Sequence, residues 1–289
     1  MRITQSLRRL AILGVFVAAP CQAQVTEGAT VLLSRLGGNV WLAKGSDLST
    51  GGNVAASIGP DGILLVDNMF DEMNARLRKA LDSVSTLPIR IVMNTHYHND
   101  HVQGNLTLGK TATIIAQENV LKRVSQGKYA GKYPMAVFTH EFTAHFNGED
   151  IRIVHFGPGH TDGDAVVFFP NAKVIHMGDL FFNGMFPGIY PEAGGDVRHL
   201  IVVLERVLGN FPPETKVIPG HGDVATMDEL RDYVTMLKET VAAAERGIKA
   251  NQSVDVLAQQ PAFTKYARLG EGGAQTLPQF VAMLVKQLQ

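Results

Sequence analysis

The chain has 289 residues, of which 45% are hydrophobic and 18% are charged. These proportions are typical of a globular protein with a sizeable core, and the length allows one large domain or two small ones. Its 26 lysines and arginines nearly balance its 27 aspartates and glutamates, so the net charge of −1 gives no electrostatic signature of a nucleic-acid-binding protein.

The first 23 residues form a segment with its own composition. Three arginines precede an apolar run over residues 10–19, and small residues occupy the positions just before residue 24 that a signal peptidase reads. The apolar run is too short to span a membrane. We therefore predict a cleaved secretory signal peptide over residues 1–23, a periplasmic or secreted mature protein, and no stable membrane insertion after cleavage.

Cys21 is the only cysteine of the chain and lies within this segment. A lipoprotein anchor on Cys21 is the alternative to plain cleavage, although Pro20 directly before it fits a lipidation site poorly. Cleavage would leave the mature protein with no disulfide and no thiolate metal ligand. An oxidising compartment is compatible with this, because a core of this size needs no disulfides.

The first part of the mature chain has the pattern of several strands followed by a helix. Apolar and β-branched runs separated by glycine-containing segments predict four strands, over residues 31–36, 39–43, 54–58 and 63–67. Asp71 is expected to cap a helix that extends to about Ser85. Residues 89–94 form another apolar run, which predicts a buried strand.

The rest of the chain repeats this order of strands and helices. Strands are predicted over residues 113–116, 141–146, 151–156, 165–169, 174–177 and 217–218, and helices over residues 118–125, 196–208, 227–249 and 277–288. Residues 128–139 are interpreted as an excursion, and a glycine-rich loop is expected between the last two helices. Two such halves would form two packed sheets with helices outside, and we predict that residues 24–289 are one domain.

One short stretch after the 89–94 strand has four residues that can bind a transition metal. His96, His98, Asp100 and His101 follow the pattern H-x-H-x-D-H. In open α/β sheets, ligands bind beyond the carboxyl ends of the strands, which is where this stretch begins. Imidazole suits zinc, iron or copper, and a carboxylate adds a hard negative ligand. The pattern therefore predicts a metal site.

Three later fragments share one pattern, in which an apolar strand and a glycine precede a metal-binding residue. The fragments end in His160, Asp179 and His221. Glycine lets the backbone turn sharply and approach a ligand closely. One such fragment means little alone, but three of them after the H-x-H-x-D-H stretch indicate a single constellation.

These fragments, in this order, resemble the metallo-β-lactamase superfamily from about Val31 to the last predicted helix. The resemblance implies an α/β fold, the four-layered αβ/βα sandwich, and two Zn²⁺ ions per chain. It assigns the first metal to His96, His98 and His160 and the second to Asp100, His101 and His221, with Asp179 at the position that bridges both metals in the glyoxalase II-like branch. Asp67 resembles the carboxylate that orients the loop histidines, and His176 is a candidate for a similar supporting role.

The residue types fit hydrolysis by a metal-bound hydroxide. Two zinc ions about 3.5–4 Å apart can share one hydroxide and keep it ionised near neutral pH. One metal then polarises a carbonyl oxygen while the hydroxide attacks, and the other takes the charge that develops on the leaving atom. Asp100 is the catalytic candidate, because it can accept a hydrogen bond from the hydroxide and orient it.

Five residues are candidates for the wall of a substrate pocket. They are Trp41, Tyr97, Phe182, Asn183 and Met185. The best-known β-lactamase subclass of the family has a cysteine where this chain has Asp179, and a lysine that holds the substrate carboxylate where it has Phe182. The departure at Phe182 makes this wall apolar and argues against efficient penicillin hydrolysis.

These observations favour an exported dinuclear zinc hydrolase that opens the ring of a small molecule, a β-lactam or a lactone. Two alternatives stay open, a thioester hydrolase of the glyoxalase II type and an iron-dependent oxidoreductase on the same fold. A metal-binding protein without catalysis is a third. The sequence indicates no nucleic-acid partner and leaves the oligomeric state open.

Overall fold

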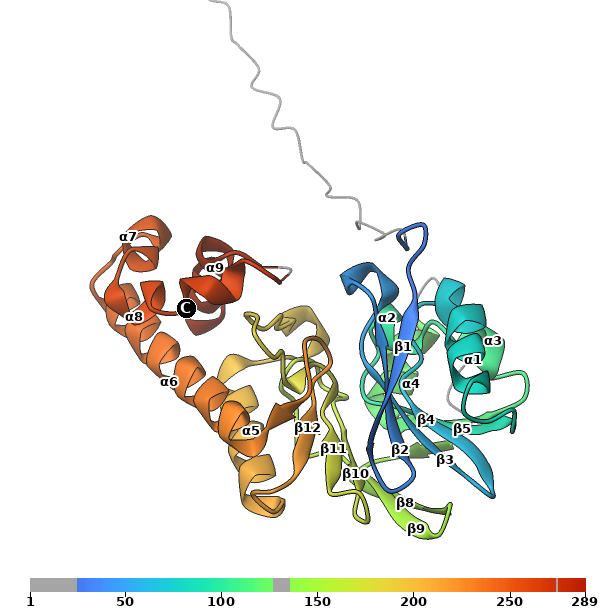
Figure 1. Cartoon of the computed structure of the whole chain (residues 1–289). Helices are drawn as coiled ribbons and strands as arrows, with labels where there is room; N and C mark the ends of the chain where they lie inside the picture. Colours follow the sequence, from blue (N-terminus) through green and yellow to red (C-terminus); the bar gives the residue numbers. More distant parts are fainter. Residues whose placement is uncertain (1–24, 127–135, 274) are drawn as a thin grey trace, which may run out of the picture.

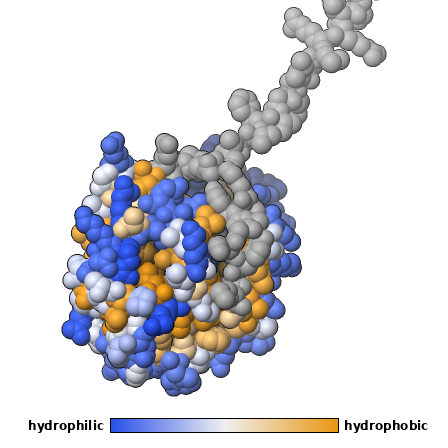
Figure 2. All heavy atoms as spheres, turned by 90° about the vertical axis from the view of Figure 1, so that its right-hand side faces the viewer, coloured by the Kyte–Doolittle hydropathy of each residue, from blue (hydrophilic) through white to orange (hydrophobic). Residues whose placement is uncertain are grey.

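The computed structural model of the chain describes residues 25–126, 136–273 and 275–289 (Figure 1). The signal peptide predicted for residues 1–23 and most of the excursion predicted for residues 128–139 lie outside these ranges. Within the described ranges, no helix is both long and apolar enough to cross a membrane. On the face shown in Figure 2, hydrophobic patches lie among hydrophilic side chains.

The first half of the chain forms a seven-stranded sheet whose strands lie side by side in sequence order. They are β1 (Val31–Gly37), β2 (Val40–Gly45), β3 (Val54–Gly59), β4 (Gly62–Val66), β5 (Ile89–Asn94), β6 (Thr113–Gln117) and β7 (Ala136–Phe138). Strands β1 to β4 are antiparallel, whereas β4 to β7 run parallel. The connections between the parallel strands contain α1 (Asn74–Asp82), α2 (Asn99–Val102), α3 (Asn105–Leu108) and α4 (Glu118–Ser125). The carboxyl ends of β4, β5 and β6 therefore lie at one edge of the sheet.

The second half forms a six-stranded sheet with the order β13-β12-β11-β10-β9-β8. Its strands are β8 (Glu141–Phe146), β9 (Glu149–Val154), β10 (Val166–Phe169), β11 (Val174–His176), β12 (Lys216–Ile218) and β13 (Ala225–Thr226). Only β11 and β12 pair in parallel in this sheet, and the helix α5 (Val197–Asn210) lies in the connection between them. The carboxyl ends of β11 and β12 are therefore neighbours.

Three clusters of buried side chains hold the layers together. One lies between the sheets and includes Leu64 of β4, Ile153 of β9 and Val167 of β10. The second packs α1 on the outer face of the first sheet, and the third packs α5 and α6 (Met227–Lys249) on the outer face of the second. The order helix, sheet, sheet, helix in Figure 1 confirms the predicted αβ/βα sandwich.

Strand β2 shows how one strand contributes to two of these clusters. Val40 and Leu42 belong to the cluster between the sheets, whereas Trp41 and Ala43 pack in the outer cluster beside α1. Successive side chains of a strand point to opposite faces, so the register of β2 turns Trp41 away from the space between the sheets. Trp41, which was predicted for the wall of the substrate pocket, therefore packs in the outer cluster beside α1.

The C-terminal region is more helical than the sequence indicated. Helices α6 and α9 (Leu277–Leu288) have the predicted bounds, and each begins with a capping box. The expected glycine-rich loop between them contains α7 (Val254–Ala258) and α8 (Pro261–Thr264), whose Leu257 and Phe263 are buried in the same cluster as α5 and α6. Helices of four or five residues have too few turns for hydrophobic periodicity to reveal them.

The first helix starts later than predicted. Asp71 does not cap it, because α1 begins at Asn74 and Asp71 lies in a preceding 3₁₀ turn. There the Asp71 carboxylate accepts a hydrogen bond from Nδ2 of Asn74 at 2.7 Å. The strands β7 and β13, of three and two residues, were not predicted, and β7 lies in the segment that was interpreted as an excursion.

Replacing Phe280 of α9 by alanine is expected to lower the free energy of unfolding by about 3–5 kcal/mol, the usual cost of such a cavity. Phe280 is fully buried, and its ring stacks on that of Phe186 at 4.3 Å. Val202→Ala on α5, where the residue is 43% exposed, is the control and should cost less than about 0.5 kcal/mol. Urea unfolding followed by circular dichroism measures both, and equal losses would contradict the packing role of Phe280.

Candidate metal centre

The seven predicted ligands meet where strand ends of the two sheets face each other. They are His96, His98, Asp100 and His101 after β5, His160 after β9, Asp179 after β11 and His221 after β12. Asp179 and His221 leave the second sheet at the same edge because β11 and β12 are parallel neighbours. The ligand atoms form two groups, and within each group they lie within 4.8 Å of one another.

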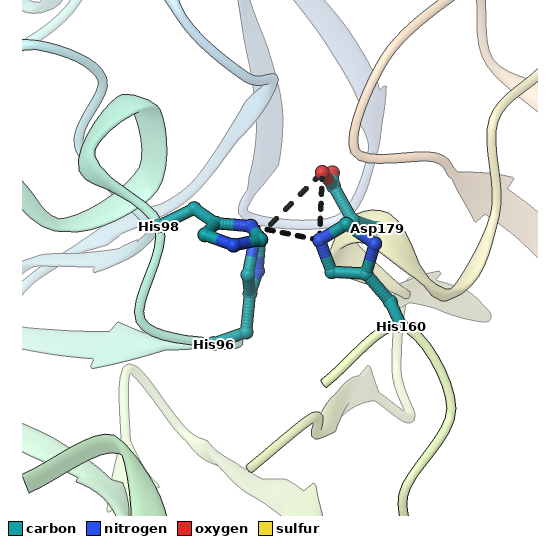
Figure 3. A group of neighbouring side chains, drawn as sticks. All are labelled: His96, His98, His160 and Asp179. Atoms are coloured by element: carbon teal, nitrogen blue, oxygen red, sulfur yellow. Dashed lines mark hydrogen bonds and ion pairs between the residues drawn. The ribbon is translucent and has the colours of Figure 1, made fainter. Parts of the chain in front are cut away.

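The first group consists of three imidazoles and one carboxylate from both sheets (Figure 3). Nδ1 of His98 lies 3.1 Å from Nε2 of His96 and 2.8 Å from Nε2 of His160. Asp179 faces these nitrogens with Oδ2, which is 3.7 Å from Nε2 of His96 and 3.4 Å from Nε2 of His160. Nitrogen and carboxylate donors that converge in this way are typical ligands of zinc.

The second group consists of Asp100, His101 and His221. Asp100 and His101 lie in the short helix α2, so the second half of the H-x-H-x-D-H stretch is helical. Oδ2 of Asp100 lies 3.1 Å from Nε2 of His221 and 3.5 Å from Nε2 of His101, and the two imidazole nitrogens are 3.4 Å apart. These three atoms could hold a second ion.

Asp179 faces both groups, with one oxygen toward each. While Oδ2 faces the first group, Oδ1 lies 3.1 Å from Nε2 of His101 and 3.5 Å from Nε2 of His221. Oδ1 is buried and receives no well-aligned hydrogen bond from any described residue. Such an oxygen is costly unless a cation lies beside it, so the residues present fit a metal ion on either side of Asp179. Gly220 makes room for this carboxylate, because a Cβ there would come within 1.9 Å of Oδ1.

The fully buried carboxylate of Asp67 holds two of the histidines in place from the end of β4. It accepts hydrogen bonds from Nδ1 of His101 at 2.7 Å and from the backbone N–H and the hydroxyl of Thr95, each at 2.8 Å. The Thr95 oxygen lies 3.1 Å from Nδ1 of His96 and can accept its proton. Both histidines therefore keep Nε2 free for a metal ion. Asp67 was predicted for this place, but Thr95 was not.

His160 takes its orientation from a backbone atom. Its Nδ1 donates a hydrogen bond to the carbonyl oxygen of Gly188 at 2.7 Å, which leaves Nε2 free for a metal ion. The backbone N–H of Tyr190 donates to the carbonyl of His160 at 3.1 Å, so this segment is tied to His160 twice. No sequence pattern marks residues 188–190, and they were not predicted to belong to the site.

His176 supports the centre from a buried position outside both ligand groups. Its Nε2 donates to the carbonyl of Asn53 at 2.9 Å, and its Nδ1 accepts from the backbone N–H of Gly178 at 3.2 Å. The Asn53 side chain donates to the carbonyls of Pro219 and Gly222 at 2.9 and 3.0 Å, on both sides of the last ligand. Asn53 was not predicted to belong to the site, because no sequence pattern indicates this contact across the molecule.

The electrostatics of the centre favour a cation. Burial lowers the pKa of His98 to about 3 and that of His96 well below its usual value, so both imidazoles are neutral. Burial opposes ionisation of Asp100, but nearby imidazoles outweigh it and lower the pKa of Asp100 to about 2. Imidazoles likewise hold the pKa of Asp179 well below its usual range against the effect of burial. The two carboxylates in turn raise the pKa of His101, which burial alone would lower.

Three aromatic rings border the ligands. Phe182 stacks on His221, with ring centres 5.6 Å apart and an angle of 11° between the planes. The ring centres of Tyr97 and Tyr190 lie 4.5 and 4.7 Å from that of His98. Burial, followed by the nearby carboxylates, raises the pKa of Tyr190 to about 12, so its hydroxyl stays protonated at neutral pH. Tyr190 was not predicted, because no motif marks it.

The other two residues predicted for the pocket wall, Asn183 and Met185, make contacts with other residues of the chain. The backbone N–H of Asn183 donates to the carbonyl of His221, and its Nδ2 donates to that of Asp223, each at 3.0 Å. Met185 is buried against Gly273, where even an added Cβ would come within 3.0 Å of its side chain. Asn183 therefore fixes the chain beside a ligand, and Met185 contributes to packing.

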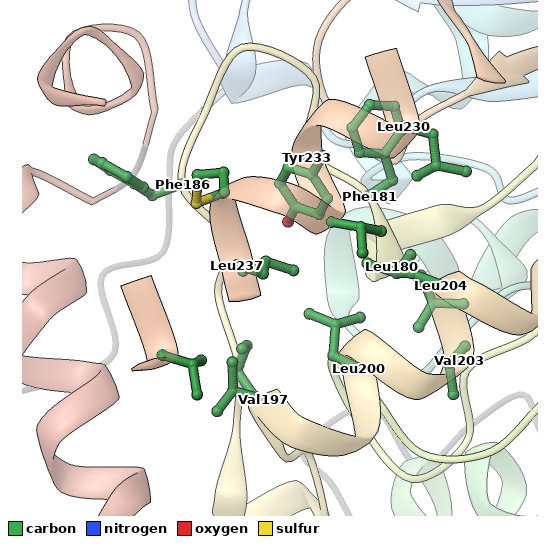
Figure 4. Close-up of a cluster of buried hydrophobic side chains, with 14 of the residues drawn as sticks. Leu180, Phe181, Phe186, Val197, Leu200, Val203, Leu204, Leu230, Tyr233 and Leu237 are labelled. Atoms are coloured by element: carbon green, nitrogen blue, oxygen red, sulfur yellow. The ribbon is translucent and has the colours of Figure 1, made fainter. Parts of the chain in front are cut away.

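The segment that carries Phe182 is anchored at both ends in the hydrophobic cluster under α5 and α6 (Figure 4). The ring of Phe181 meets that of Tyr233 of α6 edge-on at 4.9 Å. The ring of Phe186 stacks on Phe280 of α9 at 4.3 Å. These contacts give the aromatic wall a defined position next to the ligands.

Comparison with known proteins gives one consistent family. The model of the metallo-β-lactamase superfamily matches residues 50–221. The chain is 25% identical over 219 residues to the type 2 metallo-β-lactamase of Bacillus cereus, which covers 73% of this chain and 84% of that protein. It is 26% identical over 218 residues to the 2,4-dinitroanisole O-demethylase subunit alpha of a Nocardioides species, with 74% of this chain and 65% of that one covered.

Two further comparisons agree with this family. A hydroxyacylglutathione hydrolase of Crocosphaera subtropica is 29% identical over 189 residues, which cover 65% of this chain and 66% of that protein. Among solved structures, a metallo-β-lactamase from Pontibacter korlensis superposes with a TM-score of 0.64 at 18% identity, covering 72% of this chain and 99% of that one. The structural likeness shows the same fold.

Replacing Asp67 by asparagine is expected to weaken Zn²⁺ binding about 10–100-fold, the usual effect of losing a partner that orients metal ligands. The amide keeps the shape of the side chain but cannot accept all three hydrogen bonds that the carboxylate receives. Competition with a chelating dye measures the affinity. Asp82→Asn, which removes an exposed carboxylate paired with Arg78 on α1, is the control and should leave the affinity unchanged. Equal affinity of the Asp67 variant and the wild type would contradict the role given to Asp67.

Proposed function

This chain belongs to the metallo-β-lactamase superfamily of metallo-hydrolases, and from that premise we propose that it is an exported dinuclear zinc hydrolase which opens a β-lactam or a lactone ring. The observation that carries the proposal is the placement of Asp179, whose two oxygens face two separate groups of ligands. A carboxylate in such a position can serve as a ligand shared by two metal ions held close together. The N-terminal arginines and apolar run support export to the periplasm or beyond.

The ligand atoms of this centre suit zinc and hydrolysis. They are imidazole nitrogens and carboxylate oxygens, with no sulfur among them. When bound, two zinc ions supply an ionised water as the nucleophile and polarise the carbonyl that it attacks. The protein contributes the rigid positions of the ligands, which Asp67, Thr95 and the Gly188 carbonyl fix through hydrogen bonds to the imidazoles.

Asp100 is the residue that we propose to orient the nucleophile. Its side chain is 25% exposed, whereas those of Asp179 and His101 are 6% and 0% exposed, so Asp100 borders the open side of the centre. Its pKa of about 2 keeps it ionised and therefore a hydrogen-bond acceptor. A carboxylate in this position can accept a hydrogen bond from the attacking nucleophile and direct its lone pair toward the carbonyl carbon.

The walls around the centre favour an uncharged substrate portion next to His221. Phe182 covers that histidine with an aromatic ring, and Tyr97 and Tyr190 add two more rings beside His98. This supports lactones, or β-lactams that are anchored by another group than their carboxylate. The relationship to metallo-β-lactamases supports the β-lactam half of the proposal.

A thioester hydrolase of the glyoxalase II type is the second candidate. Asp179 lies at the bridging position, and hydroxyacylglutathione hydrolases are among the relatives. Glutathione esters are anionic, however, and two cations beside the described walls already have partners. Arg123 pairs with Asp162, and Lys44 pairs with Asp223.

Zinc-supplemented protein is expected to hydrolyse at least one member of a panel of β-lactams, lactones and thioesters in a chelator-sensitive reaction. Asp100→Asn should lower kcat/KM about 100-fold or more, since it replaces the charged hydrogen-bond acceptor beside the nucleophile with a neutral amide. Initial rates of the zinc-supplemented protein, together with elemental analysis of protein expressed without added metal, test this. No turnover across the panel, or iron as the dominant metal, would contradict the proposal, and iron would favour the oxidoreductase alternative.

Replacing Phe182 by lysine is expected to raise kcat/KM for carboxylate-bearing β-lactams relative to neutral lactones about 10-fold or more. A hydrogen bond to a charged group is worth about 1.5–3 kcal/mol, and only the anionic substrates can form it. Phe182→Leu, which removes the ring without adding charge, is the control and should not change that ratio. An unchanged ratio in the lysine variant would mean that Phe182 does not face the substrate.

A further inference from the structure

Helix α4 begins at the same sheet edge as the metal-binding stretch, because β5 and β6 are parallel neighbours. Two of its side chains hold Asp162, which lies two residues after the ligand His160. Arg123 donates from Nε and from a terminal nitrogen to the two Asp162 oxygens, at 2.6 and 2.5 Å. Asn119, one turn earlier on the same face of α4, donates from Nδ2 to the Asp162 carbonyl at 3.0 Å. Helix α4 therefore binds Asp162 through both its side chain and its backbone.

The guanidinium of Arg123 has a second contact, with the other histidine loop. Its central carbon lies 5.5 Å from the centre of the Tyr97 ring, which is a cation–π geometry. Tyr97 lies between two ligands in the sequence, and its ring centre is 4.5 Å from that of His98. The guanidinium of Arg123 is therefore connected to His98 through the ring of Tyr97 alone.

A third contact reaches the segment that orients His160. The remaining terminal nitrogen of Arg123 donates to the carbonyl of Glu192 at 3.4 Å, and the backbone N–H of Asp162 donates to the carbonyl of Ala193 at 2.8 Å. This segment follows directly on Tyr190. One guanidinium thus contacts three chain segments that meet at the first group of ligands.

The packing at this junction is tight. An added Cβ at Gly163 would come within 3.0 Å of the Val120 side chain and 3.1 Å of its backbone nitrogen. The side chains of Arg123 and Asp162 are only 23% and 24% exposed, so their pairing is better shielded from water than that of a surface ion pair. Loss of the pair would leave a partly buried charge without its partner and free the loop to shift.

We propose that Arg123 is a positioning residue that aligns the His96, His98 and His160 group by holding together the loops that carry these ligands. Its guanidinium joins the loop after β5, through Tyr97, to the loop after β9, through Asp162. None of the contacts described for Arg123 is with Asp100, His101 or His221. Loss of Arg123 should therefore disturb only the first group of ligands. The inference rests on the proposed metal centre.

The test measures Zn²⁺ affinity by dye competition in two single-site backgrounds. His221→Ala keeps the first group, and there Arg123→Ala is expected to weaken Zn²⁺ binding about 10-fold or more. His160→Ala keeps the second group, and there the same change should alter the affinity less than about 2-fold. Arg123→Lys keeps the charge but not the two parallel hydrogen bonds, so it should give an intermediate loss in the first background.

Arg78→Ala is the matched control for a merely structural effect. Arg78 pairs with Asp82 at 2.6 Å and donates to the carbonyls of Ser85 and Leu87, but it lies on α1 away from the ligands. Arg78→Ala should lower the thermal midpoint of unfolding about as much as Arg123→Ala does. It should leave the Zn²⁺ affinity unchanged in both backgrounds.

The outcomes separate this inference from the proposed function. Wild-type protein that binds no zinc would overturn both. Wild-type protein that binds two ions, together with equal losses in both backgrounds or no loss in the first, would overturn only the role of Arg123. Where Arg123→Ala does not fold, Arg123→Lys and Asp162→Asn carry the same comparison.

Discussion

The buried carboxylate of Asp67 is the interaction on which the metal centre depends. A negative charge without exposed surface is stable only where hydrogen bonds replace its lost hydration. Thr95 and His101 supply those bonds, and they thereby draw the loop after β5 onto the end of β4. The backbone of Asp67 has a φ of +62°, an unfavourable value for a residue other than glycine, so the same bonds also hold a strained turn.

The centre is complete only when both halves of the chain have packed together. The first sheet supplies the H-x-H-x-D-H stretch and Asp67, and the second supplies His160, Asp179 and His221. The hydrophobic cluster between the sheets brings these strand ends together. Metal affinity and the packing of the two sheets are therefore coupled, since an ion that bridges the halves also stabilises their contact.

The sequence was sufficient to predict which residues converge in the centre and where the long helices lie, and insufficient for the residues that support the centre. The ligands stand in short local patterns, and α6 and α9 are long enough to show periodicity. Thr95 could be identified only once its contact with Asp67 was known, and Asn53 contacts Pro219, which lies 166 residues away. The sequence shows the alternation of β2 but not which face of the strand points outward, so it did not indicate that Trp41 packs in the outer cluster.

Three histidines of the centre are held by three different kinds of acceptor. His101 donates to a carboxylate, His96 faces a hydroxyl, and His160 donates to the backbone carbonyl of Gly188. A side-chain acceptor disappears with one substitution, whereas every amino acid has a backbone carbonyl. In genetic terms, random mutation can remove two of these three supports directly, and it reaches the third only by changing the path of the chain.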